Sequence, residues 1–206
     1  ERPLNIKDTG GKLSAELDLR ADEERERLAG LLREAHVFVQ GYRPGGLAAL
    51  GFSPEAVARI RPGIVYVTLS AYGSGGPWSG RRGFDSLVQT AIGINAMEAE
   101  AAGLDGPKEL PCQALDHASG YLMAFGAMMA KARQAREGGS WHVQVSLART
   151  GQWLWNLGRV SDGLGTRDLT GEMVMPFIEE TSSGFGGLRS VRHSAILSKT
   201  SALWAR

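Results

Sequence analysis

An alternation of strand and helix patterns over residues 12–69 constrains the fold of this chain more than any other feature. Residues 12–19 alternate between polar and apolar, 36–40 form a short apolar run, and 64–69 are rich in β-branched residues. Leucines recur at helical spacing within 22–35. The expected elements are a strand over 12–19, a helix over 22–35, a strand over 36–40, a helix opening at Ser53-Pro54 and a strand over 64–69. Strand–helix–strand repeats place successive strands parallel in one sheet. We therefore expect an α/β fold.

The second half of the chain has a mainly helical pattern. It predicts helices over 84–97, 116–136 and 147–160 and a strand over 141–146. Apolar residues cover most of the circumference of the helix over 116–136, so we expect it to be buried on several sides. Beyond residue 161 the pattern weakens. The expected domains are an α/β domain over 1–160 and a C-terminal extension, or remnant of a smaller domain, over 161–206.

Composition excludes several classes of partner. With 23 basic and 22 acidic residues the net charge is +1, which predicts neither a nucleic-acid nor a membrane-surface partner. No apolar run approaches the about 18 residues that a membrane span needs. The single cysteine, Cys112, makes neither an internal disulfide nor a cysteine zinc site, so we expect a cytoplasmic protein.

The familiar catalytic motifs are absent from the sequence. It contains no Walker loop, no GxGxxG after a strand, no HExxH and no GxSxG. The histidines lack metal-ligand spacing, and we expect no metal site among them: His36, His117, His142 and His193.

Asp116 opens the longest predicted helix and has two interpretations. An aspartate there most often caps the helix, because its carboxylate accepts backbone N–H bonds. The same position suits a nucleophile, since the carboxylate is held rigidly and nearby N–H groups stabilise an oxyanion. His117 is adjacent, but successive helical side chains point about 100° apart. We expect His117 to have an incidental or supporting role.

Three further segments offer cations or aromatic side chains to an anionic ligand. The run 41–45, Gly-Tyr-Arg-Pro-Gly, follows a predicted strand, where α/β sheets bind ligands. Tyr42 offers a stacking face and Arg43 a phosphate partner; the alternative is a simple turn. The run 81–85, Arg-Arg-Gly-Phe-Asp, and Arg20 are either anion contacts or solvated surface.

An ordered set of motifs over roughly residues 12–160 resembles CoA-transferase family III, the CaiB/BaiF type. Residues 36–45 resemble its ADV-V-N-F-R-P-G signature, and 138–147 resemble its G-G-Q-x-V-x-V-S-L segment. Between them, further matching motifs follow in the family's order, at 50–52, 61–66, 70–77, 83–93 and 116–120.

The resemblance implies an open parallel sheet of Rossmann-like type with a helical C-terminal part. It implies a CoA-transferase whose nucleophile is Asp116, carrying CoA from an acyl-CoA donor to a carboxylic acid through an aspartyl-CoA thioester. CoA and acyl-CoA are then substrates, and no cofactor is bound permanently. The implied CoA contacts are Arg20, Gly41, Tyr42, Arg43, Arg82, Gly83, Phe84 and Asp85.

Departures from the family keep two alternatives open. Family members are longer, begin with an earlier strand, and carry a glycine-rich loop for which only residues 183–187 stand in here. Their dimers interlink, so we expect a homodimer or a complementing chain. The alternatives are an acyl-CoA racemase, although Phe84 stands where racemases have a histidine, and an inactive CoA-binding or assembly module.

Overall fold

The computed structural model describes residues 15–183 and 186–199 of the chain. It divides into two compact units, of which the larger comprises Leu17–Leu164 and the other includes the residues from Gly165 onward. Among the described residues, no helix is both long and apolar enough to cross a membrane.

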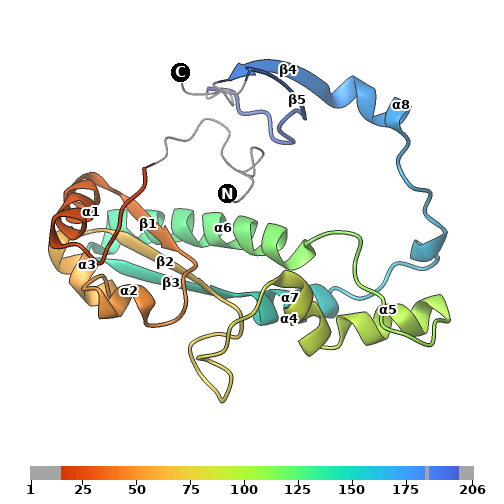
Figure 1. Cartoon of the computed structure of the whole chain (residues 1–206), viewed down its shortest axis with the longest axis horizontal. Helices are drawn as coiled ribbons and strands as arrows, with labels where there is room; N and C mark the ends of the chain where they lie inside the picture. Colours follow the sequence, from red (N-terminus) through yellow and green to blue (C-terminus); the bar gives the residue numbers. More distant parts are fainter. Residues whose placement is uncertain (1–14, 184–185, 200–206) are drawn as a thin grey trace. The chain divides into compact units, whose positions relative to one another are not determined.

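The larger unit is built on a parallel sheet, as the sequence predicts (Figure 1). Its order is β1 (Val37–Gln40), β2 (Val65–Ser70) and β3 (Trp141–Ser146). The register places Val65 of β2 opposite both Val37 and Trp141. Three strands in this arrangement form an open α/β sheet, which confirms the expected fold class.

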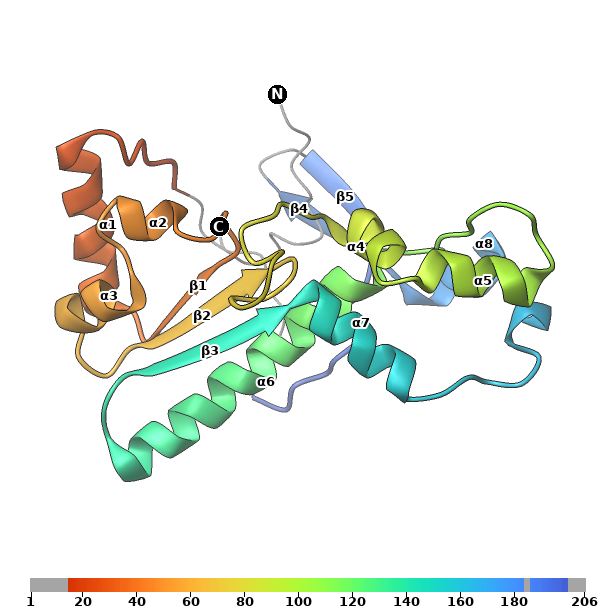
Figure 2. The same cartoon turned by 90° about the horizontal axis from the view of Figure 1, so that it is seen from below.

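Side chains of β2 alternate between two cores, one on each face of the sheet. Tyr66 packs with α1 (Asp22–Glu34), α2 (Gly46–Ala49) and α3 (Pro54–Ile60). Val65 and Val67 point the other way and pack against Ala130 of α6 (Ala114–Glu137). This period of two fixes the register, because a slip by one residue would exchange the two faces. The sheet is thus covered by helices on both sides (Figure 2).

Most predicted helix boundaries agree with the structure. Ser53 caps α3, where its hydroxyl accepts a bond of 3.2 Å from the Ala56 N–H, and Pro54 follows at the first helical position. At the C-terminal end of α6, Gly138 and Gly139 adopt positive φ angles of 70° and 74°. Glycine tolerates this conformation, which ends the helix where the sequence predicts.

The predicted strand over 12–19 is wrong for its described part, since residues 15–19 form no strand. Residues 12–14 lie outside the described residues. The Leu19 side chain packs against the core formed by α1, α2 and α3. The carbonyls of Leu19 and Arg20 accept bonds of 2.8 and 3.0 Å from Arg25 Nη1. Side chain and carbonyls are therefore directed to the helices and not to a neighbouring strand.

Two other predicted helices differ from those observed. The helix expected over 84–97 is interrupted at Gly93, whose φ of 87° separates α4 (Asp85–Ala91) from α5 (Ile94–Ala102). The helix expected over 147–160 is α7 (Leu147–Asn156), and it stops before Gly158, which has a φ of 84°. Both interruptions occur near glycines that adopt a left-handed conformation.

Helix α6 is less buried than its composition predicts. Its buried side chains are Leu115, Ser119 and Ala130, whereas a row of large apolar residues is 45–69% exposed: Tyr121, Phe125, Met128 and Met129. Within this unit α6 is covered along the side that packs on β2 and β3, and near its start by α4 and α7. The expectation of burial on several sides is therefore wrong for the larger unit.

The second unit contains a β-hairpin that the sequence pattern did not predict. Strands β4 (Ile178–Ser183) and β5 (Gly186–Val191) pair antiparallel, with Ile178 opposite Val191. Before them lie the short helices η1 (Gly163–Gly165), α8 (Gly171–Val174) and η2 (Met175–Phe177). The expected glycine-rich loop over 183–187 falls at the hairpin's turn, where residues 184 and 185 lie outside the described residues.

Candidate functional site

Asp116 is the third residue of α6, and its side chain is exposed. The N-cap position is held by Gln113, so Asp116 does not occupy the place that the capping interpretation requires. Its backbone N–H donates a bond of 2.7 Å to Oδ2 of Asp85. The two aspartates, 31 positions apart in sequence, are thus brought together, with the Asp85 carboxylate buried and Asp116 exposed.

The residues around Asp116 anchor the start of α6 to two other helices. Leu115 is fully buried in a core with Val88 of α4 and Leu147 of α7. One turn further, the hydroxyls of Ser119 and Thr150 lie 2.7 Å apart and are both completely buried. The Asp116 carboxylate therefore projects from a backbone that is held on either side by packed or hydrogen-bonded neighbours.

Asp85 and Gln89 form the buried polar network beneath this helix start. Gln89 lies one turn after Asp85 on α4 and donates a hydrogen bond from Nε2 to Asp85 Oδ1. Its Oε1 accepts from the Leu110 N–H at 3.2 Å, and its Nε2 also approaches the Cys112 carbonyl at 3.3 Å. Asp85 is 1% exposed and Gln89 2% exposed. The sequence identified Asp85 but missed Gln89, although their spacing of four residues places them on one helix face.

A cavity of about 540 Å³ lies at the carboxyl ends of β2 and β3. Its wall includes Ser70 and Ser146, the last residues of those strands. The remaining lining residues are Pro44, Thr68, Gly73, Ser74, Leu122, Gln144, Val145, Arg149, Thr150 and Trp153. Open α/β sheets bind ligands at this edge. Thr150 links the cavity to the start of α6, because its hydroxyl is the partner of Ser119.

The predicted loop 41–45 borders this cavity through Pro44. Gly41 follows β1 directly, and the Tyr42 N–H donates a bond of 2.9 Å to Oε1 of Gln40. The side chains of Tyr42 and Arg43 are exposed. The turn presents an aromatic ring and a cation to solvent, groups that can stack on a base and pair with a phosphate.

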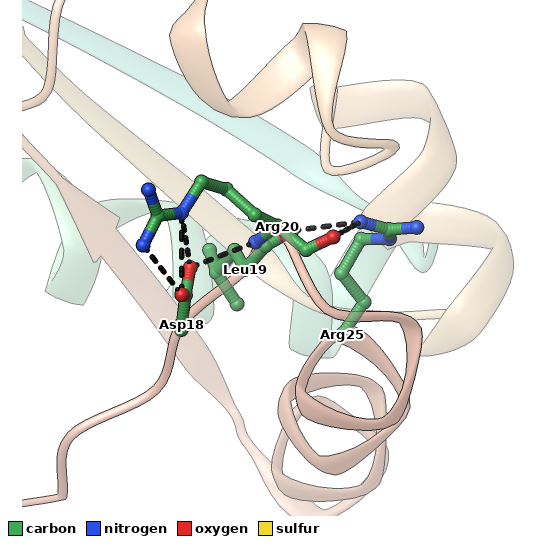
Figure 3. A network of polar contacts seen from close by, with 4 residues as sticks. All are labelled: Asp18, Leu19, Arg20 and Arg25. Atoms are coloured by element: carbon green, nitrogen blue, oxygen red, sulfur yellow. Dashed lines mark hydrogen bonds and ion pairs between the residues drawn. The ribbon is translucent and has the colours of Figure 1, made fainter.

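Arg20 lies in a polar network at the entry to α1 (Figure 3). Its guanidinium contacts Asp18 through bonds of 2.8 and 2.7 Å, while Arg25 holds its carbonyl. Hydrogen bonds from Arg20 lower the pKa of Asp18 to about 2. An incoming phosphate at Arg20 therefore has to compete with this carboxylate.

The run 81–85 divides into an exposed part and an internal one. Arg82 is exposed and Phe84 is 81% exposed, whereas the next side chain, Asp85, is buried. A Cβ on Gly83 would come within 2.8 Å of the Ala71 Cβ and 2.9 Å of the Val88 Cγ2, so only glycine fits this close approach. Asp85 therefore differs from the other predicted CoA contacts, because its side chain faces α6 and not solvent.

Two of the histidines lie in different surroundings. Among the described residues, no group of three or more histidine, cysteine, aspartate or glutamate side chains is arranged to hold a metal ion. His117 is exposed beside Asp116. His142 instead contacts the Thr68 hydroxyl at 2.9 Å, and burial lowers the pKa of its imidazole.

Comparison with known proteins identifies the family of the chain. The family model described as CoA-transferase family III matches residues 7–170. The chain belongs to CoA-transferase family III. This match confirms the resemblance seen in the motifs over 36–147, and it covers the whole of the larger unit.

Relatives and solved structures agree with this assignment. The chain is 32% identical to acetyl-coenzyme A transferase nodX of Hypoxylon pulicicidum over 70% of the chain and 25% of that protein. It is 31% identical to acetyl-CoA:oxalate CoA-transferase of Acetobacter aceti over 66% of the chain and 35% of that protein. A crystal structure of a mutant of Rv3272 from Mycobacterium tuberculosis matches with a TM-score of 0.76 and 18% identity, over 94% of this chain and 78% of that one. The last match shows the shared fold alone, and the chain spans between a quarter and about a third of the two curated relatives.

Proposed function

We propose that this chain takes part in CoA transfer between an acyl-CoA donor and a carboxylic acid acceptor, with Asp116 as the nucleophile. The observation that supports this most is the exposed carboxylate of Asp116 on a backbone fixed by Asp85, Leu115 and Ser119. Covalent catalysis needs a nucleophile that is accessible and immobile at once. Two relatives carry CoA-transferase names, for acetyl-CoA and for acetyl-CoA with oxalate.

The proposed reaction proceeds by exchange at two carbonyl carbons. A carboxylate oxygen of Asp116 attacks the thioester carbon of the donor, the C–S bond breaks, and CoA thiolate leaves with an acyl-aspartyl anhydride remaining. The thiolate then attacks the side-chain carbonyl carbon of Asp116, which expels the donor acid as a carboxylate and leaves an aspartyl-CoA thioester. An acceptor carboxylate reverses both steps, so no net proton or electron is consumed.

The predicted contacts offer groups suited to each part of the CoA moiety. Arg20, Arg43 and Arg82 offer exposed guanidinium groups for phosphates, and Tyr42 and Phe84 offer exposed rings. The cavity at the carboxyl ends of the strands borders the loop of Tyr42 and has apolar walls that suit the pantetheine arm. A homodimer or a complementing chain is part of this proposal.

The racemase alternative requires a group that transfers protons next to the thioester. Phe84 occupies the position of the racemase histidine, and its ring cannot exchange protons. The second alternative is an inactive CoA-binding or assembly module. It predicts CoA binding without exchange.

Exchange of labelled CoA between an acyl-CoA and free acids tests the proposal. The 206-residue chain, alone and mixed with a longer family member whose own nucleophilic aspartate is replaced by asparagine, is expected to catalyse exchange that Asp116→Asn abolishes. His117→Ala is the matched neighbour on the same exposed turn and is expected to retain exchange. If CoA raises the melting temperature of the chain but the chain supports no exchange in either setting, the binding-module alternative is correct.

A further inference from the structure

We infer that Asp85 is a positioning residue that fixes the nucleophile Asp116 from a second helix; this inference rests on the proposed function. The Asp85 carboxylate is 1% exposed, and carboxylates are seldom buried unless their oxygens are satisfied. Its Oδ2 accepts the 2.7 Å bond from the Asp116 N–H. The side chain therefore faces away from solvent and towards the backbone of the residue that reacts.

Both oxygens of this carboxylate are used to hold the segment that leads into α6. Oδ1 accepts from Gln89 Nε2, and Gln89 in turn contacts the Leu110 N–H and the Cys112 carbonyl. The first N–H groups of a helix lack partners within the helix. Gln113 supplies no side-chain cap, so Asp85 provides an acceptor for α6 from outside it.

This arrangement matters for reaction because attack requires near-contact geometry. A nucleophile has to lie about 3–3.5 Å from the carbon that it attacks, and a displacement of about 1 Å can cost about 100-fold in rate. Hydrogen bonds to an ionised acceptor are about twice as strong as neutral ones. Asp85 thus sets the place of the Asp116 backbone without touching substrate, and no proton moves to or from Asp85 in either chemical step.

Two variants test the role through the polarity of the network. Asp85→Asn preserves size but leaves one acceptor oxygen where the carboxylate has two, so one of its two donors loses its partner. Adding Gln89→Glu restores three of the four contacts: the new amide donates to the new carboxylate, its oxygen accepts from Asp116, and the new carboxylate still accepts from Leu110. The contact of 3.3 Å to the Cys112 carbonyl is lost, because a carboxylate has no donor. The control is Tyr66→Phe, which removes a buried bond of 3.0 Å to the Phe52 carbonyl in the opposite core.

The main readout is the rate at which the covalent adduct forms at Asp116. The dissociation constant for CoA and the melting temperature of the 206-residue chain are measured beside it. All three are measured in the setting where the wild-type chain exchanges CoA. For Asp85→Asn we expect adduct formation to slow about 10- to 100-fold, the range for loss of a bond to a charged group, with CoA affinity within about twofold. The double variant is expected to recover most of that loss. Tyr66→Phe is expected to lower the melting temperature without slowing the adduct.

The outcomes separate this inference from the proposed function. If wild-type forms the adduct and Asp85→Asn forms it equally fast, or if the double variant recovers stability but not rate, Asp85 has only a structural role and the inference is wrong. If wild-type forms no adduct in any setting, the proposed function fails, and the positioning role of Asp85 in the reaction fails with it. The NMR resonance of the Asp116 amide proton then still reports the hydrogen bond to Asp85. Because that bond weakens in Asp85→Asn, we expect the resonance to shift upfield.

Discussion

At the scale of single residues, neighbouring positions in this chain are directed to opposite environments. Phe84 lies in solvent and Asp85 beneath the start of α6, while Leu115 is buried and Asp116 exposed. The sequence predicts both aspartates as functional, yet it does not distinguish a solvent-facing contact from an internal one. That distinction depends on where α4 meets α6, which is a contact between residues 31 positions apart.

The Asp18–Arg20 pair gives a residue-scale prediction for pH. The pKa of Asp18 lies at about 2 in the folded chain, below its ordinary value of 3.8, because Arg20 donates hydrogen bonds to the carboxylate. A depressed folded pKa contributes stability that is present above 3.8 and is lost as the pH falls through about 2. Carboxyl-carbon NMR titration is expected to give a midpoint near 2, and Arg20→Gln should return it towards 3.8. A wild-type midpoint at the ordinary value would show that the pair does not form.

At the scale of elements, the three strands of the parallel sheet and the caps are what the sequence predicts best. The β-branched run over 64–69 and the Ser53-Pro54 helix start correspond to β2 and α3, because local preference and tertiary packing agree there. The break at Gly93 and the unpredicted hairpin β4–β5 show the limit. A glycine inside an apolar helical pattern is compatible with either a continuous or an interrupted helix. The polar stretch Glu179–Ser183 carries no apolar alternation that would identify a strand.

Two glycines of α6 provide a matched pair of element-scale substitutions. A Cβ on Gly126 would lie 2.7 Å from Val143 Cγ1, where α6 packs on β3, whereas a Cβ on Gly120 would meet nothing within 4 Å. Gly126→Ala is expected to lower the free energy of unfolding by about 1–3 kcal/mol through overpacking. Gly120→Ala is expected to raise it by about 0.4–1 kcal/mol through helix propensity and a less flexible unfolded chain. Urea unfolding measures both, and equal effects of the two would contradict the close packing of α6 on β3.

At the scale of the whole molecule, the larger unit leaves one side of α6 without a cover. Tyr121, Phe125 and Met128 are each more than half exposed, and contiguous apolar surface of this kind usually marks an interface. The sequence predicts burial because apolar residues surround most of this helix. It does not show which chain or unit provides the surface that covers them. The expected homodimer or complementing chain stays a prediction.

Association in solution tests that prediction at the exposed face of α6. If this face is an interface, Phe125→Glu is expected to shift the chain towards monomer in sedimentation velocity, because it places a charge among apolar side chains. Leu31→Glu on α1 is the control, since Leu31 is equally exposed, at 59%, but lies on another helix. A monomeric wild-type, or equal effects of the two substitutions, would rule out this face as the site of self-association.

The covalent state of Asp116 tests the whole account most directly. The chain, in the setting where CoA exchange is measured, is mixed with an acyl-CoA, quenched with hydroxylamine, digested, and analysed by mass spectrometry of the peptide that carries residues 114–131. The account predicts a hydroxamate on Asp116 that requires acyl-CoA and is absent from Asp116→Asn. An unmodified Asp116 in a sample that still exchanges CoA would contradict the account.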